Sequence, residues 1–137
     1  MKALFDTNVL VAAFSSEGLC SKLLSRANSS DFQLYLSPFI LGELSRNLKK
    51  KVDLSNREIQ EVILLLKEIS ITVDPLKFGI KVTGACRDKD DDNIIASALA
   101  ANVDYLVTGD NDLLVLGKYK GIKVITPRDF ELLFSKT

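Results

Sequence analysis

The segment DYLVTGDNDLL, residues 104–114, contains the pattern of a strand, a turn and a helix start in a single stretch. Tyr105, Leu106 and Val107 form a short apolar run of the kind that makes a buried strand. A glycine turn follows, and then come Asp110 and Asp112, which can cap the start of a helix. A buried strand that leads directly toward a helix is typical of βαβ units. The segment therefore predicts an α/β protein with acidic side chains just beyond a strand.

The same alternation of strands and helices extends through the rest of the chain. Short apolar runs predict strands at residues 2–5, 32–36, 69–73, 105–107 and 123–125. Helical patterns lie between them, at residues 9–14 with a continuation through 21–26, and at 38–51, 56–68, 94–101 and 127–134. Strands that alternate with helices predict a mainly parallel sheet of about five strands, with helices on both faces.

Two helix starts are marked by clear capping residues. Ser37 can cap the free amides of a helix, and Pro38 suits its first turn. Ser55 followed three residues later by Glu58 forms a capping box. By contrast, residues 74–87 contain a proline and two glycines and show no regular pattern, which predicts a long surface excursion.

Length and composition favour one compact domain. The chain has 137 residues, of which 47% are hydrophobic and 26% charged, so we expect a single domain that spans residues 1–137. No apolar run approaches the roughly 20 residues that would span a bilayer. We therefore expect neither a signal peptide nor a membrane helix, and a cytoplasmic protein.

The residue types that are missing narrow the chemistry. The sequence contains no histidine, and Cys20 and Cys86 form no CxxC pair. A zinc site and a Ser-His or Cys-His nucleophile are therefore excluded. Carboxylates, hydroxyls, lysines and arginines remain, and chemistry near neutral pH with these groups needs a metal ion or a strongly shifted pKa.

Acids from distant parts of the chain are expected to meet at one edge of the sheet. Asp6 follows the first strand, Asp110 and Asp112 follow the fourth, and Glu43 and Asp92 lie on helices that begin near the same edge. Two carboxylates about 4 Å apart repel by roughly 4 kcal/mol at an effective dielectric near 20. A domain is stable by only about 5 to 15 kcal/mol, so such a cluster needs protons or cations. Oxygen ligands of this kind suit Mg²⁺ or Mn²⁺.

Each acid taken singly has an ordinary structural interpretation. Asp6, Asp92 and the aspartates of TGDNDLL can serve as helix caps, and Glu43 can be a solvated residue of an amphipathic helix. The prediction of a metal site depends on their convergence.

Four segments in a fixed order resemble a known family. FDTN (residues 5–8), SPFILGEL (37–44), DDDNIIASALA (90–100) and DYLVTGDNDLL are similar to the motifs of PIN-domain ribonucleases, particularly the small prokaryotic toxins of the VapC kind. The resemblance covers nearly the whole chain. It implies a three-layer α/β/α sandwich around a parallel sheet, with acids that bind Mg²⁺ or Mn²⁺ for the cleavage of RNA.

The resemblance also implies roles for individual residues. It assigns Asp6, Glu43, Asp92 and Asp110 as the catalytic and metal-binding acids and Asp112 as an additional ligand. It further assigns Thr7, Asn8 and Thr108 to ordering the site. Asp91 fits another version of the third motif; Asp92 is preferred because it lies one turn before Ala96, where a small residue permits close packing, and Asp91 is the second choice.

The substrate and the partners follow mainly from the resemblance. The chain has 18 basic and 18 acidic residues and a sequence pI of about 6.3, so its overall charge does not indicate RNA. Candidates for phosphate contacts are Arg46, Lys49, Lys50 and Lys51, on the helix that bears Glu43, and Arg87, near the acid run; a solvated helix end explains the first four equally well. The resemblance implies a cognate antitoxin and a homodimer, and the helix at 56–68 has an apolar surface broad enough for an interface.

Two other interpretations compete with the nuclease. A receiver-type phosphotransfer domain also has an aspartate after its first strand, but FDTN lacks the second acid that it needs. A catalytically silent PIN-like module that binds RNA or protein would be expected to lack one of the acids, whereas every expected position is filled.

Overall fold

The computed structural model describes residues 1–134 and contains a six-stranded sheet in the order β3-β2-β1-β4-β6-β5. Each adjacent pair is parallel except β5 and β6, which form an antiparallel hairpin. The five predicted strands are confirmed within two residues at either end, and β5 is additional. The strands are β1 (Lys2–Phe5), β2 (Gln33–Leu36), β3 (Ser70–Thr72), β4 (Tyr105–Val107), β5 (Lys118–Tyr119) and β6 (Ile122–Ile125).

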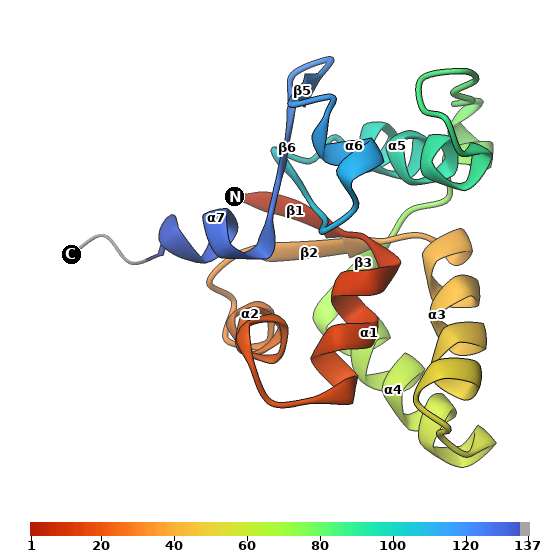
Figure 1. Ribbon diagram of the computed structural model, residues 1–137, viewed down its shortest axis with the longest axis vertical. Coiled ribbons are helices and arrows are strands. Elements are labelled where there is room, and N and C mark those ends of the chain that lie inside the picture. The colour runs from red at the N-terminus through yellow and green to blue at the C-terminus, as the bar shows by residue number, and fades with distance from the viewer. Residues whose placement is uncertain (135–137) are drawn as a thin grey trace.

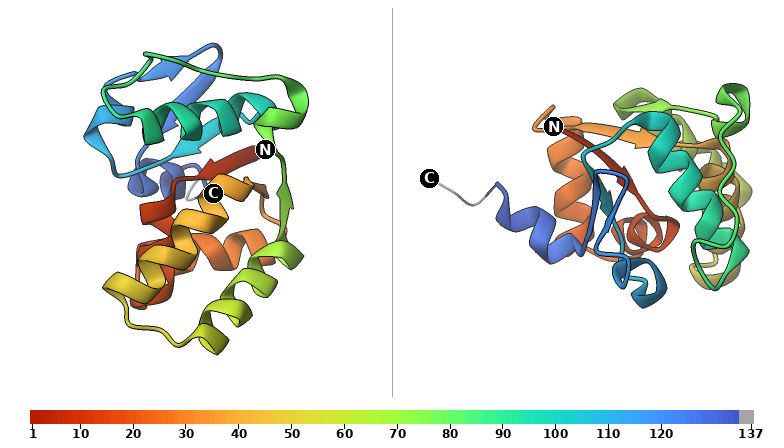
Figure 2. Two further views of the ribbon diagram at one scale, coloured as in Figure 1. Left: turned by 90° about the vertical axis from the view of Figure 1, so that its right-hand side faces the viewer. Right: turned by 90° about the horizontal axis from the view of Figure 1, so that it is seen from above.

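Helices lie on both sides of this sheet and give the expected three layers. Figures 1 and 2 show α5 on one side and α1, α2 and α7 on the other, with α3 and α4 packed beyond α1. The helices are α1 (Thr7–Ser15), α2 (Leu19–Asn28), α3 (Pro38–Lys51), α4 (Asn56–Ile69), α5 (Lys89–Ala101), α6 (Asn111–Leu114), α7 (Pro127–Leu132) and the 3₁₀-helix η1 (Pro75–Phe78).

The strands at the centre of the sheet are buried on both faces. In β1, residues Ala3, Leu4 and Phe5 have no exposed surface, and Leu106 and Val107 of β4 are buried in the same way. Aromatic rings hold α7 against the sheet, because Phe130 makes edge-on contacts with Phe5 and Phe32 at centroid distances of 5.9 and 5.0 Å. This central pair of strands is the rigid support for the acids that follow Phe5 and Val107.

The caps predicted for α3 and α4 are present. The Ser37 side chain accepts a hydrogen bond from the Ile40 amide at 3.3 Å, and α3 has the predicted bounds. Ser55 and Glu58 form both bonds of the capping box at the start of α4. Local sequence therefore determines where these two helices begin.

Several helical boundaries differ from the prediction, and among them α7 ends at Leu132 instead of residue 134. Helix α1 ends at Ser15 and α2 begins at Leu19, so the expected continuation is instead a separate helix after a short break. Helix α5 begins at Lys89, five residues before the predicted start at position 94. Its cap is Asp88, which accepts a hydrogen bond from the Asp90 amide at 2.9 Å. The apolar periodicity starts only at Ile94, so the pattern alone missed this polar first turn.

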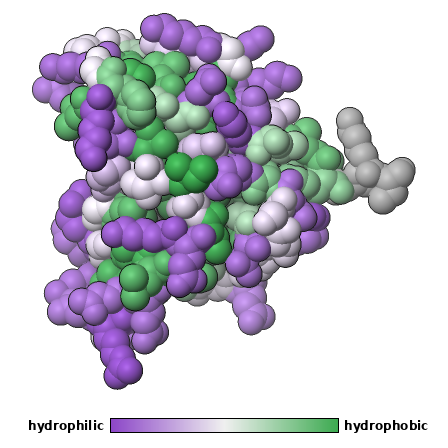
Figure 3. All heavy atoms as spheres, turned by 180° about the vertical axis from the view of Figure 1, so that it is seen from behind, coloured by the Kyte–Doolittle hydropathy of each residue, from purple (hydrophilic) through white to green (hydrophobic). Residues whose placement is uncertain are grey.

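The segment between β3 and α5 is mostly irregular, as predicted, and includes η1. Two exposed apolar residues, Leu76 and Phe78, lie in this segment, and Leu64 on α4 and Ile71 on β3 are exposed as well. Viewed from behind, the apolar residues form patches separated by hydrophilic side chains (Figure 3). Within residues 1–134, no helix has the length and apolar character needed to cross a membrane.

Candidate metal centre

Asp6 is fixed at the junction of β1 and α1. It caps α1, and one of its carboxylate oxygens accepts a hydrogen bond from the Thr7 amide at 2.7 Å. The other oxygen accepts a bond from the Thr108 hydroxyl, also at 2.7 Å. Burial raises the pKa of Asp6, and the nearby Asp110 adds to the rise, although the two hydrogen bonds oppose it. Asp6 is therefore held in one orientation in a site that disfavours its charge.

Glu43 is connected to Asp6 through Thr7, whose backbone amide donates to Asp6. The Thr7 hydroxyl donates a hydrogen bond of 2.8 Å to Glu43 on α3. Burial is the main cause that raises the pKa of Glu43, Asp90 and Asp6 raise it further, and Thr7 and Arg46 lower it. Thr7 thus links the first helix to the third and brings two acids from distant segments to one place.

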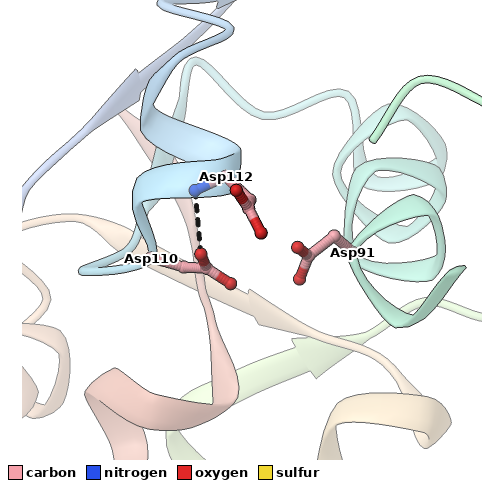
Figure 4. Close-up of side chains that lie close together, drawn as sticks. All are labelled: Asp91, Asp110 and Asp112. Atoms are coloured by element: carbon pink, nitrogen blue, oxygen red, sulfur yellow. Dashed lines mark hydrogen bonds between the residues drawn. The ribbon is translucent and has the colours of Figure 1, made fainter. Parts of the chain in front are cut away.

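Asp91, Asp110 and Asp112 form a close group of acids. Each contributes a carboxylate oxygen, and these oxygens all lie within 4.8 Å of one another. Figure 4 shows Asp91 reaching from α5 toward the two aspartates at α6. Asp110 caps α6 by accepting a hydrogen bond of 2.9 Å from the Asp112 amide, and its own amide donates to the Thr108 hydroxyl at 3.0 Å. Thr108 therefore connects this group to Asp6.

Asp91 has the environment expected of a cation ligand. The residue is buried, and its Oδ2 atom has no hydrogen-bond partner. Burial, followed by the charges of Asp110 and Asp6, raises the pKa of Asp91 to about 7. A buried oxygen without a partner is costly, and three carboxylates in contact repel one another. An all-oxygen donor set of this kind fits a hard divalent cation such as Mg²⁺ or Mn²⁺.

Asp92, the acid preferred from the sequence, has a different environment. Its carboxylate accepts hydrogen bonds from the amides of Gly84 and Cys86 at 3.0 and 2.9 Å, so it anchors the irregular segment to α5. Successive helical residues differ in direction by about 100°, and Asp91 consequently faces the other acids whereas Asp92 faces away. The structure therefore brings Asp91, the second choice, into the group. The signal that identifies this arrangement is Asp88, whose role as the cap sets the start of α5.

A pocket of about 210 Å³ connects the two groups of acids. Asp91 and Asp110 belong to the close group and also line this pocket, where they face Asp6 and Glu43. The remaining lining residues are Thr7, Asn8, Asn47, Lys51, Asp88, Asp90 and Ile94. A larger hollow of about 530 Å³ lies elsewhere, between the ends of α2 and α4, and contains none of the predicted site residues. The smaller pocket is the one with a concentration of reactive groups.

Three of the predicted cations, Arg46, Lys49 and Arg87, are not among the lining residues of this pocket. Arg46 is on α3 near Glu43, Lys49 lies at 3.4 Å from the Asn56 side chain, and Arg87 lies at 3.9 Å from Asp112 but is largely exposed. Of the predicted basic residues at the end of α3, Lys51 lines the pocket, and Asn47 is a pocket residue that was not predicted. Their spacing of four and eight residues after Glu43 places all three on one side of α3, and that spacing is the signal that identifies them.

A buried hydrogen bond fixes α3 relative to α5. The Ser97 hydroxyl lies at 2.8 Å from the hydroxyl of Ser37, the residue that caps α3. Both side chains are fully buried. Because Glu43 lies on α3 and Asp91 on α5, this contact helps to set the width of the pocket.

Comparison with known proteins agrees with this architecture. The family model described as PIN domain matches residues 2–112. A chain in the crystal structure of VapBC2 from Rickettsia felis, bound to a DNA fragment from their promoter, has the same fold with a TM-score of 0.61 and 16% sequence identity. The alignment covers 92% of this chain and 98% of that one. The search of curated proteins gave no match. Since the family model spans most of the sequence and the positions of its acids, the chain belongs to the PIN-domain family.

Proposed function

We propose that this protein is a divalent-metal-dependent endoribonuclease. Asp91 provides the main support, because its buried oxygen has no partner in the protein and faces two further carboxylates. A structural role gives no reason to keep such a group, since an unpaired buried carboxylate destabilises the fold. A catalytic role that requires a cation gives a reason to keep it.

The residues divide into those that hold the cation and those that orient them. Asp91, Asp110 and Asp112 would hold Mg²⁺ or Mn²⁺, with Asp6 and Glu43 on the adjoining wall of the pocket. When bound, the cation lowers the pKa of water and stabilises charge at the scissile phosphate. Thr7 and Thr108 hold Asp6 and Glu43 in position through their hydrogen bonds. Without a cation, a pKa of about 7 leaves Asp91 partly protonated at neutral pH.

RNA as the substrate and a toxin role extend this proposal. Both are suggested by the similarity of FDTN, SPFILGEL, DDDNIIASALA and DYLVTGDNDLL to small VapC-type toxins. The likeness of the fold to a chain in a VapBC2 structure is compatible with them. On this proposal a cognate antitoxin inhibits the protein. We further propose a homodimer, since Leu64 and Leu65 on α4 are exposed by 62% and 40%.

RNA cleavage by purified protein tests the nuclease function. We expect a single-stranded RNA to be cut in Mg²⁺ or Mn²⁺ and to stay intact in EDTA. Asp6→Asn should abolish cutting. The metal-free variant should melt at the parent temperature or higher, because burial penalises the Asp6 charge by more than the hydrogen bonds from Thr7 and Thr108 offset. An intact RNA with the parent protein under every metal condition, together with a lower melting temperature for Asp6→Asn, would overturn the proposal.

A further inference from the structure

The negative charge of the acidic pocket repels the phosphates of a nucleic acid. Six carboxylates line it, from Asp6, Glu43, Asp88, Asp90, Asp91 and Asp110. Among the described lining residues, Lys51 is the one cation. A divalent ion can neutralise the carboxylates closest to it, but the phosphates next to the scissile one still meet a negative wall.

Lys51 is located where it can offset this repulsion. It is the last residue of α3 and lies two turns after Glu43, with Asn47 between them on the same side of the helix. Helical side chains lean toward the N-terminus, so Lys51 is directed back toward Asn47 and the acids. Glu43, Asn47 and Lys51 therefore form a row that leads from the acids to a positive charge.

We propose that Lys51, assisted by Asn47, binds an RNA backbone phosphate adjacent to the scissile one and so sets the path of the strand along α3. Lysine suits this task because it is a point charge with three donors that tolerates a moving phosphate. The amide of Asn47 can donate to a phosphate oxygen without adding charge. This inference rests on the proposed nuclease function, and it replaces Arg46, Lys49 and Arg87 as the main phosphate contacts.

The neighbouring lysine provides a matched control. Lys50 lies in the same turn of α3, is exposed and is not among the pocket residues. Lys51→Gln and Lys50→Gln remove the same charge from adjacent positions, so they differ only in access to the pocket. Both residues are exposed, and we expect both variants to keep the parent melting temperature.

Steady-state cleavage of a short single-stranded RNA in Mg²⁺ is the first measurement. We expect Lys51→Gln to raise KM about tenfold with little change in kcat, which is the effect of losing one charged hydrogen bond. The salt dependence of log(1/KM) should become shallower by about 0.7, the value for one phosphate on a single strand. Lys50→Gln should follow the parent in both respects. Equal effects of the two substitutions would overturn the proposal, because they would show a general charge effect.

Substrates with one uncharged methylphosphonate linkage locate the contact. A methylphosphonate at the linkage that Lys51 contacts should weaken cleavage by the parent protein but should not weaken cleavage by Lys51→Gln any further. A methylphosphonate at any other linkage should affect both proteins equally.

Titration of each protein with Mn²⁺ alone is the second readout, and Lys51→Gln should retain the parent affinity for Mn²⁺. A loss of Mn²⁺ affinity without a linkage-specific effect would assign Lys51 to the metal site and overturn the proposal. A parent that cuts no RNA overturns the nuclease function itself, whereas a parent that cuts RNA equally well with Lys51→Gln overturns only this inference.

Discussion

Two acids of this protein, Asp91 in the pocket and Glu131 on α7, are both poorly exposed but have opposite surroundings. Glu131 receives hydrogen bonds from Arg26 at 2.6 and 2.8 Å and lies at 3.0 Å from the Lys22 ammonium. These contacts, led by the Arg26 bonds, lower the pKa of Glu131 to about 2. Burial raises the pKa of Asp91 to about 7, and the carboxylates that it faces add to the rise. Low exposure is common to both, so the charge of the neighbours decides which acid is structural and which one needs a cation from outside.

Substitution of Asp91 is expected to have the largest effect. Asp91→Asn removes one of three clustered oxygens, and we expect RNA cleavage in Mg²⁺ to fall by at least about 100-fold. The metal-free protein should be as stable as the parent or more so, because an unpartnered charge is lost. Cleavage assays and thermal unfolding in EDTA measure the two effects. Normal cleavage by Asp91→Asn would remove Asp91 from the site.

The two acids should also give opposite slopes in the pH dependence of stability. The raised pKa of Asp91 means that the folded protein binds an extra proton between about pH 4 and 7, so the free energy of unfolding should fall as pH rises through this interval. The lowered pKa of Glu131 means that its contribution is present above about pH 4.5 and is lost as pH falls toward 2. Urea unfolding in EDTA at several pH values tests both. Mn²⁺ should flatten the first slope and leave the second unchanged; a profile that Mn²⁺ does not alter would contradict the metal site.

Substitution of Asp92 tests whether Asp91 and Asp92, which are adjacent on α5, have different roles. The Asp92 carboxylate accepts hydrogen bonds from two backbone amides, and Asp92→Asn places an NH₂ donor against one of them. Two donors that face each other should cost about 1–3 kcal/mol of stability. Cleavage should fall much less than in Asp91→Asn, because the close group of acids is retained. Urea unfolding and limited proteolysis of residues 74–87 report the loss of the anchor. An inactive Asp92→Asn beside an active Asp91→Asn would restore the preference drawn from the sequence.

Glu131 gives the smallest expected effect and the cleanest control. Glu131→Gln weakens a charged hydrogen-bond pair between α2 and α7, and we expect a loss of about 1 kcal/mol at pH 7. Cleavage in Mg²⁺ should stay at the parent rate, since the residue lies outside the pocket. The loss should diminish in high salt, which screens the Lys22 and Arg26 charges. A drop in cleavage at unchanged stability would mean that the two regions are coupled.

Sequence patterns predicted the strands and most helices because these elements are specified locally. Apolar runs mark β1 and β4, and caps such as Ser37 and Ser55 mark where helices begin. The two-residue strand β5 was not predicted, because Lys118 and Tyr119 show no periodicity and pair only through the hairpin. The start of α5 was not predicted because its first turn is polar. The preference for Asp92 relied on its spacing to Ala96, which does not show which side of the helix faces the other acids.

The candidate site required tertiary information that no local pattern contains. Motif order was enough to select Asp6, Glu43 and Asp110, which line one pocket. The role of Lys51 depends on the direction of α3 relative to the acids, and that direction is set by packing and by the contact between Ser37 and Ser97. Neighbouring lysines look alike in the sequence and differ only in the face of the helix that they occupy.

The hydrogen bond from Thr108 to Asp6 joins residues that are 102 positions apart. During synthesis, Asp6 and Glu43 leave the ribosome early, but the pocket closes only after β4 has inserted beside β1 and the turn at Thr108 has emerged. A polypeptide that ends before Thr108 contains Asp6, Glu43 and Asp91 but lacks Asp110 and Asp112, so its centre is incomplete. The complete centre can therefore assemble only when translation is nearly finished.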